Sequence, residues 1–144
     1  MQERERIEVF SQNREILLTI DPRGLATIAS AKFRTRTGIY LSGTIVSTAV
    51  SDDGERVAYI AATLMFDWVH VMVRQPGDRY IQKTGKRIMR GKGISVAWDE
   101  QSSIPCLCVM TNEGILSLVY DGEWKWREAA PVADPPAIFV TAQS

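Results

Sequence analysis

The stretch that decides the fold runs from Gly93 to Arg127 and reads GISVAWD (93–99), IPCLCVMT (104–111), GILSLVYDG (114–122) and EWKWR (123–127). Its four runs are rich in β-branched, aromatic and other apolar residues, and polar turn residues, among them Asp, Asn and Gly, occur at 99–103, 112–114 and 121–122. This pattern is typical of consecutive antiparallel strands joined by tight turns. The stretch therefore predicts a four-stranded meander sheet.

The same order of strands and turns occurs upstream, at an offset of 48 residues. The matching pairs of segments are 46–51 with 94–99, 57–63 with 105–111 and, after a small change of register, 69–74 with 115–120. A weaker copy covers residues 17–30, with Gly38–Leu41 as its candidate third strand. An internal repeat of this length predicts repeated sheets rather than one continuous sheet.

We therefore expect a single all-β domain over residues 16–142, built from repeated antiparallel four-stranded meanders. The expected sheet units lie at about 16–44, 45–92 and 93–130, with a final strand at about 137–142 after a proline-rich connector. Residues 1–15 form a charged N-terminal segment. Within it, residues 1–10 either begin a helix or form a tail that leads into a strand over Ile7–Phe10.

Composition agrees with a soluble globular chain, because 45% of the 144 residues are hydrophobic and 17 basic residues balance 17 acidic ones. A net charge of zero gives no global argument for nucleic acid or a membrane as partner. The sequence has no apolar run of about 18 residues, and its first residues lack the apolar segment of a secretory signal. These features predict a cytoplasmic protein that does not span a membrane.

The two cysteines, Cys106 and Cys108, lie two residues apart in an expected strand and so face the same side, roughly 7 Å apart. This spacing disfavours a mutual disulfide and favours two reduced thiols that pack as small apolar groups. A metal site is not expected, since His70 is the sole histidine and no second cysteine pair exists.

The segment SDDGERVAYI (51–60), which follows an apolar strand, resembles the turn after the inner strand of β-propeller blades. Asp21–Gly24 is similar to a shorter version of this turn, and TNEG (111–114) is similar to a turn between the second and third strands of a blade. The Trp-Asp pair of WD40 repeats lies on the third strand, whereas Trp98-Asp99 ends a first strand here. The resemblance is therefore to propellers in general and implies a partial propeller of about three blade-like units.

A four-stranded blade takes about 40 to 50 residues, and closed propellers have about 4 to 8 blades. Three units cannot close such a ring. The chain is then part of a larger propeller, or copies associate to complete one, or the sheets pack as a compact β-sandwich or barrel. Open sheet faces and edges favour association, so we expect self-association or a partner chain.

Six basic residues form the most distinctive local feature, in a segment over 79–92 that contains no acidic residue. They are Arg79, Lys83, Lys86, Arg87, Arg90 and Lys92. Such a segment can neutralise the phosphates of a nucleic acid or meet another anionic partner. The alternative is a solvated outer strand and loop whose charges face water.

Four aromatic residues form a second candidate surface. Trp124 and Trp126 alternate on one expected strand and share a face, and Phe66 and Trp68 alternate in a connection long enough to project. Such rings can bind a sugar or a partner, or they can pack between adjacent sheets.

No catalytic pattern accompanies these residues. His70 has no positioned nucleophile or carboxylate, and neither Thr84–Arg87 nor Gly91–Gly93 has the spacing of a phosphate-binding loop. We therefore predict no enzyme activity and no cofactor. The main hypothesis is a protein–protein interaction module or scaffold. The alternatives are a nucleic-acid or anionic-ligand binder and a lectin-like glycan binder.

Overall fold

The computed structural model of the chain describes residues 6–31, 34–40, 44–77, 79–89 and 91–128. Its strands form three antiparallel four-stranded sheets, each with its strands in chain order. The first sheet contains β1 (Ile7–Phe10), β2 (Leu17–Ile20), β3 (Leu25–Ala29) and β4 (Arg34–Tyr40). The second contains β5 (Thr44–Val50), β6 (Arg56–Ala62), β7 (Asp67–Gln75) and β8 (Arg79–Arg87). The third contains β9 (Gly93–Trp98), β10 (Cys106–Thr111), β11 (Gly114–Tyr120) and β12 (Trp124–Glu128).

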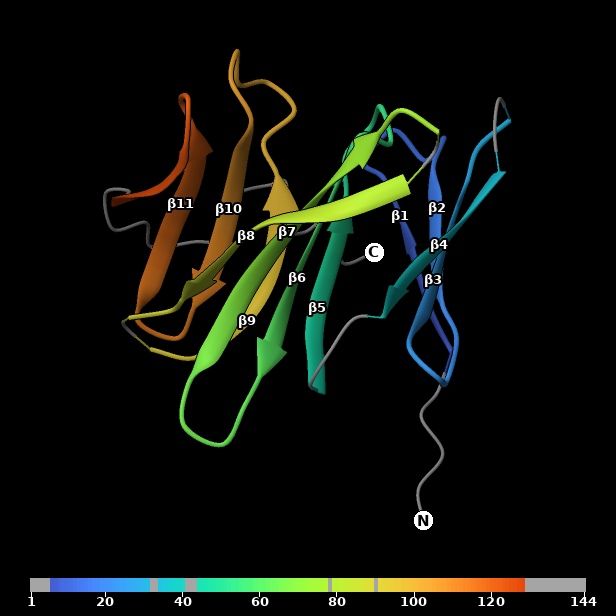
Figure 1. Ribbon diagram of the computed structural model, residues 1–144. Helices are drawn as coiled ribbons and strands as arrows, with labels where there is room; N and C mark the ends of the chain where they lie inside the picture. The colour runs from blue at the N-terminus through green and yellow to red at the C-terminus, as the bar shows by residue number, and fades with distance from the viewer. Residues whose placement is uncertain (1–5, 32–33, 41–43, 78, 90, 129–144) are drawn as a thin grey trace.

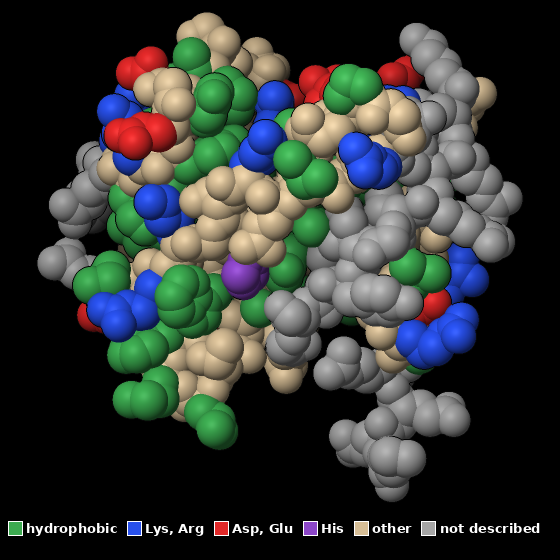
Figure 2. Space-filling view, viewed as in Figure 1, with side chains coloured by type: hydrophobic (Ala, Val, Ile, Leu, Met, Phe, Trp, Pro, Cys, Tyr) green, Lys and Arg blue, Asp and Glu red, His purple; other side chains and the backbone are tan. Residues whose placement is uncertain are grey.

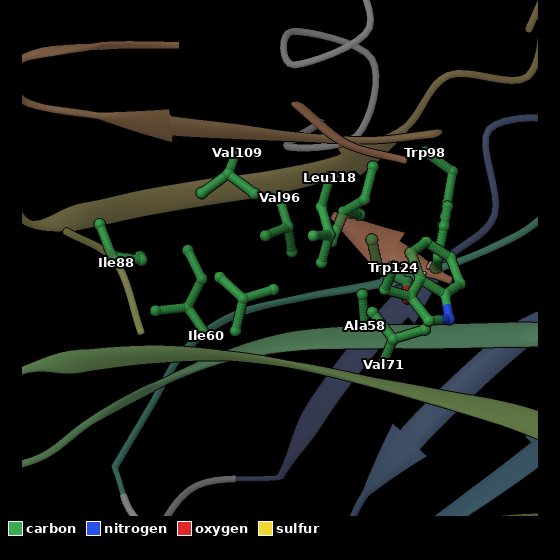
Figure 3. Packing of buried hydrophobic residues seen from close by; sticks show 12 residues of the cluster. Ala58, Ile60, Val71, Ile88, Val96, Trp98, Val109, Leu118 and Trp124 are labelled. Carbon is green, nitrogen blue, oxygen red and sulfur yellow. Dashed lines mark hydrogen bonds between the residues drawn. The ribbon is translucent and has the colours of Figure 1, made fainter. Parts of the chain in front are cut away.

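The second sheet lies between the other two and is buried on both of its faces (Figure 1). Strand β6 shows this most clearly. Its residues Val57, Tyr59 and Ala61 pack in a core shared with the first sheet. Ala58 and Ile60 point the opposite way, into a core shared with the third sheet (Figure 3). A strand with apolar residues at every position is expected where both faces are covered, which explains the continuous run VAYIAA.

The repeat at an offset of 48 is confirmed as a structural repeat, because β5, β6 and β7 match β9, β10 and β11 in order and pairing. Equivalent first strands also contact one another. The backbone amide of Val96 on β9 donates to Ser47 Oγ on β5 at 3.1 Å, and Trp98 Nε1 donates to the carbonyl of Ala49 at 3.3 Å. The first strands of the second and third sheets are thus held side by side.

The first sheet begins at Ile7, so the strand alternative for the N-terminal segment describes residues 7–10. The placement of Asp21–Gly24 as the counterpart of the Ser51–Gly54 turn is wrong. Asp21–Gly24 joins β2 to β3, whereas the true counterpart joins β1 to β2 and runs from Ser11 to Ile16.

The all-β prediction is confirmed, and the described strands do not close into a barrel. None of the described residues belongs to a helix that is long and apolar enough to cross a membrane. The predicted final strand at 137–142 lies outside the described residues.

Candidate interaction surfaces

A cleft with a volume of about 510 Å³ lies between the outer strands of the second and third sheets. The side chains that give its walls their chemistry are Arg56, Lys83, Lys86, Tyr120, Glu123 and Trp124. The second sheet supplies the three basic residues and the third supplies the aromatic rings. The cleft therefore brings together part of the predicted basic segment and part of the predicted aromatic surface.

A β-bulge in β8 places Lys83 in this cleft. Met72 pairs with Gln82, while the preceding residue, Val71, pairs with Thr84, so Lys83 is the extra residue of the bulge. In a regular strand Lys83 and Lys86 would face opposite sides, because they are three residues apart. The bulge changes the direction of a side chain, so both lysines line the same cleft.

Arg56 lies at the start of β6 and forms part of the cleft wall. Its guanidinium carbon is 5.3 Å from the centre of the Trp98 ring, a cation–π geometry. Nε of Arg56 is buried and has no hydrogen-bond partner. Its charge also acts on Asp53 and Glu100. Burial acts to raise the pKa of both carboxyls, and the charge of Arg56 opposes that effect in each. The pKa of Asp53, which also accepts hydrogen bonds from Ser51 and the backbone, lies below its ordinary value, whereas that of Glu100 lies above it.

The aromatic wall of the cleft is built around Trp124. Its ring centre lies 5.3 Å from that of Tyr120 and 6.1 Å from that of Trp98, the latter in an edge-on arrangement. Trp124 is buried in the core shared with the second sheet (Figure 3). Trp126 packs against the same core. Tyr120 is 42% exposed, so its ring is the part of this wall most open to solvent.

A second feature, the apolar tip, consists of Leu64, Met65, Phe66 and Met89. The loop between β6 and β7 carries the first three (Figure 1). Hydrophobic side chains gather at that end of the molecule in Figure 2. Leu64 is fully exposed, Met65 is 80% exposed and Met89 is 70% exposed. Trp68 follows on β7, where it is half-buried and pairs with Ala61 and Arg87.

The loop that carries the apolar tip is closed by its own hydrogen bonds. The amide of Thr63 donates to the carbonyl of Phe66 at 3.0 Å, and the amide of Phe66 donates to Thr63 Oγ1 at 3.2 Å. The guanidinium of Arg87 lies 4.2 Å from the centre of the Phe66 ring and donates to Met89 Sδ. These contacts fix the backbone of the loop and the side chains of Phe66 and Met89, while Leu64 and Met65 extend into solvent.

The basic segment is therefore divided rather than gathered into one patch. From Arg79 to Arg87 it forms strand β8, at the edge of the second sheet, and not a loop. Lys83 and Lys86 line the cleft, whereas Arg87 belongs to the apolar tip. Arg79 begins β8 and is exposed, Lys92 is exposed beside Asn112, and Arg90 lies outside the described residues.

His70 and the cysteines lie on strands inside the sheets. The His70 ring stacks on Tyr59 with ring centres 4.9 Å apart, and its buried Nδ1 has no hydrogen-bond partner. Burial lowers the pKa of His70, so the ring is neutral at neutral pH. Cys106 and Cys108 are free thiols on β10, and the described residues contain no group of three or more side chains suited to hold a metal ion.

Sequence reasoning did not select Arg56 or Tyr120. Arg56 follows the Ser51–Gly54 turn, and its position looked like an ordinary strand start. Tyr120 ends β11 just before the turn at Asp121. The internal repeat could have indicated both residues. Because equivalent sheets pack side by side, the start of β6, where Arg56 lies, comes near the end of β11, where Tyr120 lies.

The comparison with protein-family models matches none of them, and the comparison with curated proteins finds no similar sequence. Function is therefore argued from the surfaces alone.

Proposed function

We propose that the protein is a non-catalytic protein–protein interaction module and that a partner chain docks on its apolar tip. The observation that carries this proposal is the exposure of Leu64 and Met65 at the end of a hairpin that is closed by hydrogen bonds. Hairpin turns usually carry Asp, Asn and Gly, as Asp21–Gly24 and Ser51–Gly54 do here. An apolar patch in such a place marks an interaction site more often than a packing defect.

The composition of the tip suits a protein partner. Leucine, methionine and phenylalanine supply apolar area, and methionine adapts to irregular surfaces. Because Thr63 fixes the loop, ordering it on binding costs little entropy. The partner expected is an apolar groove with an acidic rim, since the guanidinium of Arg87 lies over the Phe66 ring, whereas the nearby carboxylate of Asp67 accepts a hydrogen bond from the amide of Gly93.

The arrangement of the sheets supports the same proposal. We infer that they are three consecutive blades of a propeller-like array, because their first strands contact one another while the cleft opens between outer strands. Three blades are too few to close a ring by themselves. A partner chain, or a second copy of this chain, would complete the array, and the projecting tip is free to contact it.

The test compares the full chain with the double variant Leu64→Ser/Met65→Ser. Phe10→Ser is a matched control, because Phe10 and Phe66 are both 41% exposed and both lie under an arginine. Sedimentation velocity over a wide concentration range measures self-association, and cross-linking in an extract of the source cells identifies a partner. The tip variant should lose the association that the wild type and Phe10→Ser retain. A wild type that stays monomeric and cross-links no differently from the tip variant would overturn the proposal.

A further inference from the structure

The cleft between the second and third sheets is independent of the apolar tip and has the features of a ligand site. Its volume of about 510 Å³ falls within the range of small-molecule pockets, roughly 300 to 1,000 Å³. One wall is basic and the opposite wall is aromatic. A ligand that fills it must therefore present an anionic group to the second sheet and a flat apolar part to the third.

The charge of the cleft sets the charge of that ligand. Arg56, Lys83 and Lys86 supply three positive charges and Glu123 supplies one negative charge, which leaves two positive charges uncompensated within the lining. Asp53 and Glu100 reduce the field of Arg56, although neither lines the cleft. Among the described residues no carboxylate forms an ion pair with Lys83 or Lys86. The two lysines are therefore cleft cations without an ion pair in the described part of the chain, and a phosphate monoester, with a charge of about −1.5 to −2 at neutral pH, suits such a pair.

The geometry of Arg56 adds a second argument for an anion. Its guanidinium is held by the Trp98 ring, so its position is fixed before any ligand binds. Its buried Nε has no hydrogen-bond partner among the described residues, so the surrounding protein does not use this donor. A planar guanidinium in the wall of the cleft is well suited to the oxygens of a phosphate.

The aromatic wall argues for a ring on the ligand. Tyr120 is tilted against Trp124 and keeps much of its ring in contact with solvent. A flat heterocycle that stacks on an exposed aromatic ring gains binding energy without any specific hydrogen bond. Lys83 and Lys86, across the cleft, would hold the phosphate of the same molecule.

We propose that the cleft binds a phosphate group joined to a flat heterocyclic ring, a ligand of mononucleotide size. The phosphate lies against Arg56, Lys83 and Lys86, and the ring lies against Tyr120. The same chemistry is offered by a free nucleotide and by one nucleotide unit of a single-stranded nucleic acid. This site goes beyond the proposed interaction function and does not depend on it.

The test titrates the full chain with adenosine 5′-monophosphate, adenosine, inorganic phosphate and a short single-stranded oligonucleotide, with binding measured by calorimetry. The monophosphate should bind about tenfold more tightly than either adenosine or phosphate alone, because each of these lacks one half of the contacts. Equal affinity for inorganic phosphate would overturn the role of the ring. Tighter binding of the oligonucleotide would assign the ligand to a nucleic acid, and weaker binding would assign it to a free nucleotide.

Variants of the lysines test the position of the site. Lys83→Gln and Lys86→Gln should each lower the affinity for the monophosphate by about tenfold. Lys125→Gln is the matched control, because Lys125 is exposed on β12 and its neighbour Trp124 faces the cleft, so Lys125 faces the other side. Tyr120→Leu should lower the affinity by about fivefold.

The lysines are chosen over Arg56 because they are not packed on a core ring, so unchanged thermal unfolding is expected for both variants. A wild type that does not bind the monophosphate, or lysine variants that bind it as Lys125→Gln does, would overturn the proposal. Leu64→Ser/Met65→Ser should bind it like the wild type, which separates this site from the apolar tip.

Discussion

Two turns of the molecule, Ser11–Ile16 and Ser51–Arg56, have the same hydrogen bonds although they share only the serine and one glutamate. In each, the serine hydroxyl donates to the side-chain oxygen two residues on at 2.6 Å and accepts from the amide five residues on at 3.0 Å. The fourth residue has positive φ in both turns, 63° at Arg14 and 74° at Gly54. The serine therefore defines the hydrogen bonding of this turn, and most of the other positions tolerate different residues.

The acceptor residue differs between the turns for a local electrostatic reason. Asn13 donates from its side-chain amide to Glu15 at 3.1 Å, and its backbone amide donates to Asp52 in the neighbouring sheet at 2.9 Å. A carboxylate at position 13 would stand beside these two negative charges. The second turn has Asp53 instead, close to the positive charge of Arg56.

Removal of the serine should give the largest effect and should differ between the turns. Ser51→Ala is expected to lower the free energy of unfolding by about 2 to 3 kcal/mol, because it removes a bond to a carboxylate and leaves the amide of Arg56 without its acceptor. Ser11→Ala should cost about 1 to 2 kcal/mol, since its acceptor is the neutral Asn13. Urea denaturation of both variants measures the difference. Equal losses would show that the charge of the acceptor contributes nothing.

The position with positive φ should give an intermediate effect of opposite sign in the two turns. Gly54→Ala should cost about 1 kcal/mol, because a Cβ is strained at this φ. Arg14→Gly should instead stabilise the protein by up to about 1 kcal/mol, reduced by the lost contact of Arg14 with Phe10.

Gly122→Ala is the reference for the glycine effect. Gly122 has a φ of 80°, and a Cβ there would meet no atom within 4 Å, so its cost reports the backbone alone. Thermal unfolding of the three variants provides the comparison. A destabilised Arg14→Gly would mean that the arginine side chain contributes more than its backbone strain costs.

These turns also show how far the sequence predicts the fold. Ser51–Gly54 has the Asp and Gly residues that are usual in turns, so the sequence predicts this turn and the strands on both sides of it. Ser11–Ile16 has Asn and Arg in their places, so its sequence resembles this turn less than Asp21–Gly24 does. Identical hydrogen bonding from such different residues depends on backbone geometry, which a single sequence does not display.

The candidate sites were predictable only in parts. Lys83, Lys86 and Trp124 were selected from local composition, but their meeting in one cleft depends on the packing of two sheets and on the bulge at Lys83. Alternation along β8 would place that lysine on the wrong face. Arg56 was missed because its chemistry arises from Trp98, far along the chain.

The smallest effect on the free energy of unfolding is expected for a substitution of Asp53, the residue that accepts the hydrogen bond from Ser51, and this effect depends on pH. Burial raises the pKa of Asp53, but the hydrogen bonds from Ser51 and the backbone and the charge of Arg56 outweigh burial, so the pKa lies below its ordinary value. The stability that this carboxylate contributes is therefore present above its unfolded pKa, near 3.8, and is lost as the pH falls through its lower folded pKa. Asp53→Asn should cost less than about 1 kcal/mol at neutral pH, since an amide oxygen still accepts the bond from Ser51.

The pH dependence makes this small difference measurable. Urea denaturation of the wild type and Asp53→Asn should give curves of stability against pH that are separated at neutral pH and converge below about pH 4. All other carboxylates are common to the two proteins, but the charge of Asp53 raises the pKa of Glu100, so the change in separation reports Asp53 together with its effect on Glu100. A constant separation across this range would mean that the charge of Asp53 does not contribute to the stability of the second turn.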